Sequence, residues 1–312
     1  MKVRSEKELF KTSIGGQALI EGVMMKGPDK TAMAVRKPNG EIELRLDENK
    51  DISSYPFLNW PLIRGCYRLF LAMSEGIEAL TYSASFWEEE EEDKKPGLLD
   101  RLFPKQSERI ATGLSILFSF VLAFVFFMVL PNFLANLARH YTESSLLLNL
   151  LEGLLRILIF FIYLMVISRV EDIYRVLQYH GAEHKSIACY EHGDELTVEN
   201  AMKHSRLHPR CGTSFLFMVL VISILVLSFF GWPNPVLRLV IRLIMLPLIA
   251  GIAYEINRVL GRCDKGFCQA LARPGLEIQR LSTTKEPDEK QVEVALAALK
   301  AVIPEDEGRA LW

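Results

Sequence analysis

The 312-residue sequence lacks charge in two long stretches. Residues 110–138 and residues 212–237 contain no Asp, Glu, Lys or Arg over 29 and 26 positions. About 20 apolar residues in a helix are enough to span a bilayer, so these stretches argue against a wholly soluble protein. Taken with the apolar residues around them, they predict four spans, at residues 110–130 (closed by Pro131), 146–170, 213–230 and 236–260.

The sequence also lacks a basic excess, since 36 basic residues face 38 acidic ones and the net charge is −2. A nucleic-acid partner is therefore not expected. No Walker A loop, G-x-G-x-x-G or G-x-S-x-G sequence is present. Only five cysteines occur, an odd number at irregular spacing, so we predict no disulfide framework and expect all five thiols to stay reduced near the cytoplasm.

Lys and Arg are distributed unevenly among the segments that connect the predicted spans. Residues 1–109 carry 17 of them, residues 171–210 carry five, and residues 260–312 carry eight. The two remaining connections carry one and none. Because cytoplasmic segments are enriched in Lys and Arg, we predict a multi-pass protein of the cell (inner or plasma) membrane. Both termini and the middle loop are expected in the cytoplasm.

The two ends of the chain predict a small α+β subdomain. Pro-Asn-Gly at 38–40 separates two strand-like runs and favours a hairpin, and residues 13–24 could add a third strand. Residues 276–281 alternate like a strand, and an amphipathic helix follows from Asp288 to about Val302. Neither end buries a core alone. We therefore predict that residues 1–60, a β-rich segment, pack with residues 261–312.

Between this subdomain and the first span lie two further segments. Residues 61–86 predict an interfacial or re-entrant helix, with a buried soluble helix or a fifth span as alternatives. Residues 87–109 contain an acidic run that indicates a solvated linker leading to the first span. The predicted fold class is thus an α-helical polytopic membrane protein. It has about four transmembrane helices in residues 110–260 and one cytoplasmic α+β subdomain.

The middle loop, residues 171–210, holds the densest group of reactive side chains. His180, Glu183 and His184 share one face if this segment is helical, in the H-x-x-E-H arrangement. Two imidazoles one turn apart can chelate a divalent metal such as Zn²⁺, and the carboxylate can act as a base toward bound water. The alternative is a polar, solvated turn of helix, and Gly181 weakens the helix prediction.

A second group of metal-ligating residues follows in the same loop. His208 is a candidate third ligand, with His204 and Cys211 as possible additional ligands and Glu255 as a possible carboxylate ligand from the end of the fourth span. The alternative is a structural turn. A straight continuation of the second span would place His184 about 20 Å above the membrane, far from His208. The loop must fold back for one shared site, and Gly181 or Gly193 could interrupt the helix.

Four ionisable residues lie inside the predicted spans. Glu152 and Arg156 are one turn apart in the second span, and Arg238 and Arg242 are one turn apart in the fourth. Buried charges at membrane depth are expensive and usually pair. We therefore predict intramembrane ion pairing in which Glu152 faces Arg242 or Arg238. A transport path is the alternative, although the first and third spans contribute no charge.

The combined motifs resemble the YqhQ family of bacterial membrane proteins. They are Gly-Gly-Gln-Ala-Leu-Ile-Glu-Gly-Val-Met-Met at 15–25, His-Gly-Ala-Glu-His-Lys at 180–185, His-Pro-Arg-Cys-Gly-Thr-Ser-Phe at 208–215, and Pro-Gly-Leu at 274–276 with Gln279. The resemblance implies a membrane protein labelled as a predicted metal-dependent enzyme, without a defined reaction. It also draws attention to Gln17 and Glu21, which could line the same cavity as the histidines or belong to a glycine-bulged strand.

Two functions follow as hypotheses. One is a cytoplasm-facing metal-dependent hydrolase that acts on a lipid or a membrane peptide, with Glu183 as base and His180, His184 and His208 as metal ligands. The other is a non-catalytic factor that assembles or scaffolds membrane proteins and has a membrane-protein partner besides the lipid bilayer. A transporter is disfavoured because the sequence shows no internal repeat.

Overall fold

The computed structural model describes residues 10–49, 56–87, 107–263 and 266–310, and these form two compact units. The sheet unit contains the described residues up to 87 together with residues 164–219 and 250–310. The helical unit contains residues 107–163 and 220–249. Most of the predicted acidic linker at 87–109 lies outside the described residues.

The sheet unit is built around a four-stranded antiparallel sheet in the order β1-β2-β3-β4. The predicted hairpin at Pro-Asn-Gly is confirmed and joins β3 to β4, with Gly40 at a φ of 90°. The predicted third strand is in fact two strands, because a tight turn containing Glu21, at a φ of 50°, reverses the chain. The strands are β1 (Gly15–Leu19), β2 (Gly22–Lys26), β3 (Lys30–Arg36) and β4 (Ile42–Glu48).

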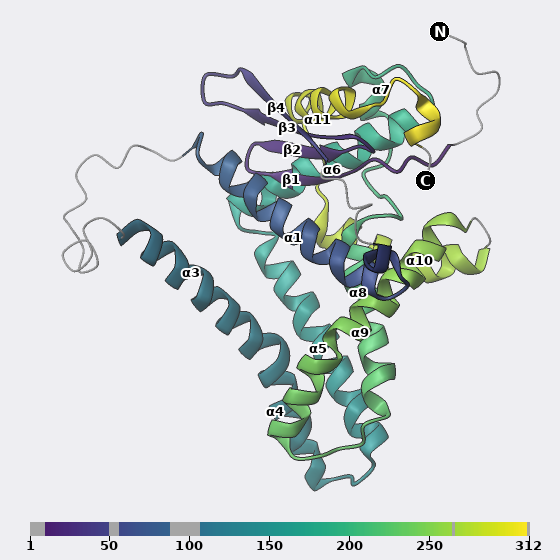
Figure 1. The fold of residues 1–312 in the computed structure, drawn as a ribbon. Coiled ribbons are helices and arrows are strands. Elements are labelled where there is room, and N and C mark those ends of the chain that lie inside the picture. Colours follow the sequence, from purple (N-terminus) through teal and green to yellow (C-terminus); the bar gives the residue numbers. More distant parts are fainter. Residues whose placement is uncertain (1–9, 50–55, 88–106, 264–265, 311–312) are drawn as a thin grey trace. The chain divides into compact units, whose positions relative to one another are not determined.

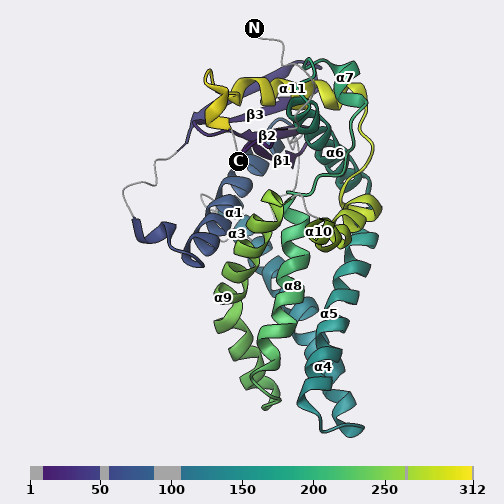
Figure 2. The same ribbon diagram turned by 90° about the vertical axis from the view of Figure 1, so that its right-hand side faces the viewer.

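Helices cover both faces of this sheet (Figures 1 and 2). Side chains of strands alternate between faces, and β2 and β3 are buried on both. On one face they pack against α6 (Glu171–Glu191) and α11 (Glu289–Val302) in one apolar core. On the other face they pack against α1 (Ile63–Ala84) through Ala79. The sheet is therefore the central layer of its unit.

α1 corresponds to the helix predicted at 61–86. Its buried side contains Gly76, Ala79 and Ser83. Its other side exposes large apolar residues, and Phe70 is 73% exposed and Ile77 56%. Its placement at a membrane interface stays a prediction.

The C-terminal segment confirms one prediction and corrects another. The predicted helix is α11, which begins with a capping box between Asp288 and Gln291. The predicted strand at 276–281 is wrong, because these residues belong to α10 (Gly266–Ile278) and to the π-helical turn Gln279–Thr283 that follows it. Six alternating residues do not distinguish a strand from a helix end. Here Ile278 and Ser282, one turn apart, are both buried.

Most residues of the helices that are long and apolar enough to cross a membrane lie in the helical unit. Three helices of the described chain meet this criterion, at Gly113–His140, Ser145–Ile167 and Pro235–Arg262. The predicted span at 213–230 is instead a shorter apolar helix, α8 (Gly212–Ser228), of 17 residues. The first of the three segments contains most of α3 (Ser107–Phe124) and all of α4 (Leu130–Leu137), and the other two are α5 (Ser145–Ile167) and α9 (Pro235–Arg262).

The prediction that Pro131 closes the first span is wrong, because the helix continues through it. A proline inside a helix clashes with the carbonyl four residues earlier and leaves that carbonyl without its usual donor. A π-helical turn at Val125–Val129 precedes Pro131 and relieves the clash. The carbonyl in question is that of Phe127, and it accepts a hydrogen bond from Nε of Arg156 at 3.2 Å. The buried arginine therefore stabilises the continuous helix.

The expectation that all five cysteines stay reduced is also wrong. Cys263 directly follows α9, and Cys268 lies in the first turn of α10. The change of helix brings their Cα atoms to 5.9 Å, and the two residues form a disulfide. Cys189 and Cys211 are thiols, and both are buried.

Candidate metal centre

The H-x-x-E-H sequence lies on α6, which is one continuous helix through Gly181. The prediction that this glycine weakens the helix is wrong, and its role is to allow close packing. A Cβ atom at Gly181 would lie 2.1 Å from the carbonyl oxygen of Lys285. α6 ends at Glu191, just before Gly193, which has a φ of 69°. The chain then returns through α7 (Val198–Met202) toward the same face of α6.

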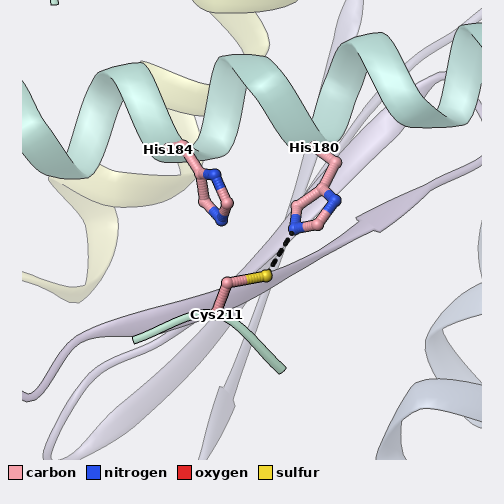
Figure 3. Close-up of side chains that lie close together, drawn as sticks. All are labelled: His180, His184 and Cys211. Carbon is pink, nitrogen blue, oxygen red and sulfur yellow. Dashed lines mark hydrogen bonds between the residues drawn. The ribbon is translucent and has the colours of Figure 1, made fainter. Parts of the chain in front are cut away.

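Two histidines and a cysteine meet on that face (Figure 3). The donor atoms of His180, His184 and Cys211 all lie within 4.8 Å of one another. Sγ of Cys211 is 3.2 Å from Nε2 of His180, and the two imidazole rings have centroids 4.4 Å apart. Cys211 immediately precedes α8, at the end of the loop that returns from α7, and its sulfur lies against this face of α6. These three residues are called the His-His-Cys cluster below.

Backbone carbonyls fix the orientation of both imidazoles. Nδ1 of His180 donates to the carbonyl of Thr283, and Nδ1 of His184 donates to the carbonyl of Arg206, each at 2.7 Å. Because a carbonyl only accepts, the proton of each neutral ring is assigned to Nδ1. The Nε2 lone pairs are then available to a metal ion. Metal-binding histidines are usually held by such hydrogen bonds to their second nitrogen.

The electrostatics of the cluster favour a charged sulfur. Burial raises the pKa of Cys211, but its electrostatic interactions and hydrogen bonds with His180 and His184 outweigh burial and lower it well below its usual value. Burial lowers the pKa of His180, but the charge and hydrogen bond of Cys211 outweigh it and raise it to about 9. Each residue thus favours the charged form of the other, the thiolate of Cys211 and the imidazolium of His180. The thiolate is the form that ligates metals.

Glu183 lies beside the cluster and borders an internal cavity. Its carboxylate is buried, with Oε2 3.8 Å from Nε2 of His180. Gly16 allows this arrangement, because a Cβ there would lie 2.9 Å from Cγ of Glu183. The cavity measures about 120 Å³, room for several water molecules. Its walls are Ile14, Gly15, Gly16, His180, Glu183, His184, Ile187, His208, Arg210, Cys211 and Gly212.

His208 lines the same cavity but is not one of the three grouped donors. Its ring centroid is 5.5 Å from that of His184. Its Nε2 lies 3.4 Å from a carboxylate oxygen of Glu191, and its backbone N–H donates to Oε1 of Gln279 at 2.9 Å. The structure therefore brings the two histidine motifs together, although a straight helix would have kept them apart. Cys211, predicted only as an additional ligand, takes the position expected for His208.

The two polar residues of the N-terminal motif do not line the cavity. Side chains alternate along β1, so Gly16 faces Glu183 while Gln17 packs against Gly76 of α1. Glu21 forms a salt bridge with Arg175, and its Oε2 accepts from the hydroxyl of Tyr179 at 3.2 Å. The hypothesis that Gln17 and Glu21 share the cavity of the histidines is wrong.

Two further candidate ligands also lie elsewhere. Nε2 of His204 is 2.9 Å from a carboxylate oxygen of Asp194, and its ring lies against that of His192 at 4.6 Å. Glu255 forms a salt bridge with Arg64 of α1. The carboxylate of Glu255 is therefore paired with an arginine and does not line the cavity.

Glu191 and Gln279 support the cavity but were not predicted as site residues, although Gln279 belongs to the motifs of the family resemblance. Glu191 accepts from the backbone N–H of Thr12 at 2.7 Å and forms a buried salt bridge with Arg210. Glu191 lies seven residues after His184, two turns along the same helix face, so helical spacing alone could have found it. Gln279 is fully buried and bonds both the N–H and the carbonyl of His208. No local pattern marks that contact.

The four ionisable residues predicted inside the spans are all buried in the helical unit. Glu152 accepts from Arg156 at 2.9 Å and forms a salt bridge with Arg242 on α9. Arg238 does not reach Glu152, and instead donates to Asn132 at 2.6 Å. Of the two pairings predicted from the sequence, the structure thus contains the one with Arg242.

Comparison with known proteins returns uncharacterised relatives. A family model described as "Protein of unknown function (DUF1385)" matches residues 60–305. The chain is 33% identical over 299 residues to the "Uncharacterized protein YqhQ" of Bacillus subtilis (strain 168), covering 93% of this chain and 92% of that protein. No solved structure matches. The resemblance to the YqhQ family is confirmed, and none of these descriptions supplies an activity.

Proposed function

We propose that this chain, which belongs to the DUF1385 family of proteins of unknown function, is a membrane-bound, metal-dependent hydrolase. His180, His184 and Cys211 would hold one divalent metal, with Zn²⁺ as the expected ion, and Glu183 would act as the base. The observation that carries this proposal is the His-His-Cys cluster, in which three strong donors from two segments converge beside a buried carboxylate.

The donor set fits zinc. Zn–N bonds of about 2.0–2.1 Å and Zn–S bonds of about 2.3 Å place tetrahedral ligand atoms roughly 3.4–3.7 Å apart. The 3.2 Å between Nε2 of His180 and Sγ of Cys211 is close to that spacing. The remaining donors lie within 4.8 Å and need to move inward by about 1 Å or less. Three protein ligands also leave a fourth position open, as in catalytic zinc sites.

Hydrolysis is the reaction that the neighbouring residues support best. A bound divalent metal supplies Lewis acidity and lowers the pKa of water. Glu183, buried beside the cavity, would take the proton from that water. Arg210, at the cavity wall, would attract an anionic substrate oxygen, while Glu191 and Gln279 hold Arg210 and His208 in place. The carbonyls of Thr283 and Arg206 would keep both imidazoles aligned.

The membrane context of this proposal comes from three helices of spanning length and from the distribution of Lys and Arg. We propose that the protein is multi-pass in the cell membrane and has both termini in the cytoplasm. α8, with 17 residues, would act as a fourth, short span. The His-His-Cys cluster would then face the cytoplasm, and the substrate would be a lipid or a membrane peptide.

Metal content tests the proposal directly. The full chain would be purified without a His-tag or added metal, and bound metals would be quantified by mass spectrometry. We expect about one metal ion per chain, lost in the His180→Ala/His184→Ala double variant. His192→Ala is the matched control, because it removes an imidazole from the end of the same helix, outside the cluster. A metal-free native protein would refute the metal site.

The hydrolase step is tested separately with Glu183→Gln. This variant keeps a polar side chain of the same size and should retain the metal. Hydrolysis of membrane lipids or peptides by the loaded wild-type protein should fall about 100-fold or more in the variant. If activity persists unchanged, Glu183 is not the base.

A non-catalytic role in assembling or scaffolding membrane proteins is the second candidate. The observation that favours it is the exposed apolar side of α1, where Phe70, Met73 and Ile77 are each at least half exposed. A large exposed apolar patch often marks a protein or membrane contact. A membrane-protein partner retained in mild detergent and lost in a Phe70→Ser/Ile77→Ser variant would support this role.

A further inference from the structure

The helical unit buries more positive charge than negative charge. Arg156, Arg238 and Arg242 are each at most 9% exposed, and the one buried carboxylate among the described residues of the unit belongs to Glu152. Glu143, by contrast, is exposed. The buried excess is therefore two positive charges. Burying charges without compensation is costly, and arginine does not escape the cost by losing its proton.

The hydrogen bonds of two of these arginines leave donors unused. Arg242 donates one terminal nitrogen to Glu152, while its Nε and Nη1 are buried and have no partner within the described chain. Arg238 donates its two terminal nitrogens to neutral oxygens, those of Pro233 and Asn132, and its Nε has no partner there either. The guanidinium of Arg238 is thus hydrogen-bonded, but no carboxylate neutralises its charge.

A small crevice opens beside these two guanidinium groups. It lies between α5, α9 and the loop that joins α8 to α9, and it is lined by Asn149, Gly231, Pro233, Arg238 and Arg242 together with three apolar residues. Its volume of about 10 Å³ is roughly that needed by one water-sized atom. The guanidinium of Arg238 also stacks on the ring of Trp232, 3.7 Å from its centroid. This stacking holds Arg238 in place.

We infer that Arg238 and Arg242 form a phosphate-binding site in the helical unit. One phosphate oxygen would enter the crevice and accept from the unused donors, and the rest of the group would stay at the mouth. Two positive charges require an anion rather than a neutral ligand, and the guanidinium fork matches the geometry of phosphate. The phosphate of a lipid headgroup offers the same oxygens as the free ion, so both can be recognised by an arginine pair. If the helices span a membrane as proposed, the source is a phospholipid headgroup, and otherwise it is free inorganic phosphate.

The test measures phosphate and lipid binding by the full chain. The protein would be purified in detergent and analysed by native mass spectrometry after exchange into phosphatidylglycerol or into diacylglycerol, which lacks the phosphate. Thermal unfolding of the delipidated protein would be followed with added inorganic phosphate or with chloride at equal ionic strength. The variants are Arg238→Gln and Arg242→Gln. Arg169→Gln is the control, since Arg169 is an exposed arginine that does not line the crevice.

We expect phosphatidylglycerol to remain bound to the wild type and to the control, and its affinity to fall about tenfold or more in each site variant. Glu152→Gln separates binding from folding, because it raises the buried excess to three charges. It should bind the phosphate group more tightly than the wild type. A network that serves structure alone would not produce this gain.

The outcomes distinguish the sources. Retention of the phospholipid but not of diacylglycerol supports a headgroup site. Stabilisation by inorganic phosphate without lipid retention supports a site for the free ion. Equal effects of phosphate and chloride, or equal binding by wild type and both site variants, would overturn the inference. Because no part of this test involves the His-His-Cys cluster, failure here leaves the hydrolase proposal untouched.

Discussion

Replacing Cys211 by serine is the sharpest test of the metal centre. The substitution changes one atom, the sulfur 3.2 Å from Nε2 of His180. A hydroxyl does not ionise at neutral pH and is a much poorer zinc ligand than a thiolate. Structural zinc sites with four ligands contribute about 10–16 kcal/mol, so each ligand accounts for about 2.5–4 kcal/mol. We therefore expect the Kd for Zn²⁺ to rise about 100- to 1,000-fold.

The same change predicts a loss of metal-dependent stability. At a free Zn²⁺ concentration 100 times the Kd of the wild type, binding stabilises the folded state by about 2.7 kcal/mol. If the variant binds 100-fold more weakly, the same concentration equals its Kd, and the stabilisation is about 0.4 kcal/mol. Unfolding of both proteins would be compared with added Zn²⁺ and with a chelator. The chelated proteins should unfold alike, apart from the loss of the thiolate–imidazolium pair.

His208→Ala is the comparison that decides whether Cys211 or His208 is the third metal ligand. His208 lines the cavity but is not among the grouped donors, so its loss should weaken binding by about tenfold, the low end of the range for residues around a metal site. If His208→Ala abolishes binding and Cys211→Ser leaves it unchanged, the ligand assignment is wrong and the original sequence-based ligand set is right. If neither substitution changes the metal content, the metal lies elsewhere.

Further outcomes follow from packing, burial and capping in the sheet unit. Gly181→Ala would place a Cβ 2.1 Å from the carbonyl oxygen of Lys285, so chemical denaturation should show a loss of about 1–3 kcal/mol or more, and a loss below 0.5 kcal/mol would refute the close packing. Burial raises the pKa of Cys189 to about 11, from about 9 in the unfolded chain. The buried thiol therefore contributes to stability below pH 9, and this contribution declines as the pH rises toward 11. Measurements of the free energy of unfolding against pH should show the decline, and Cys189→Ala should remove it. Asp288→Ala should cost about 0.5–2 kcal/mol through loss of the capping box with Gln291, with Asp288→Asn retaining most of it.

Local patterns predicted the parts of the fold that depend on neighbours in the sequence. The hairpin at Gly40 depends on a glycine that adopts a φ of 90°, and α11 depends on apolar spacing that follows a capping aspartate. The shared helix face of His180 and His184 follows from helical geometry alone. Each of these features is fixed within a few residues, which is the range over which such patterns carry information.

The errors arose where distant contacts decide the structure. Pro131 usually ends a helix, but Arg156, on another helix, bonds the carbonyl that the proline leaves without a donor. Glu255 lies at a suitable end of its helix for a metal ligand, yet Arg64 binds it from nearly 200 residues away. The sequence gives no spacing rule for such pairs. The return of Cys211 to α6 belongs to the same class, whereas the end of α6 near Gly193 was among the alternatives that the sequence offered.

The π-helical turn at Gln279–Thr283 explains why a segment outside both histidine motifs matters to the cluster. The carbonyl of Thr283 accepts from Nδ1 of His180, and Gln279 holds the backbone of His208 through two hydrogen bonds. Arg206, whose own carbonyl orients His184, donates to the carbonyl of Thr284 at 2.6 Å. One turn thus positions all three histidines of the cavity wall. A regular strand at this place would separate Gln279 and Thr283 by about 13 Å along its axis, against about 6 Å in a helix, so the contacts with His208 and His180 would lie much farther apart. The strand prediction therefore failed at the segment that supports the cluster, in keeping with the frequent occurrence of π-helical turns at functional sites.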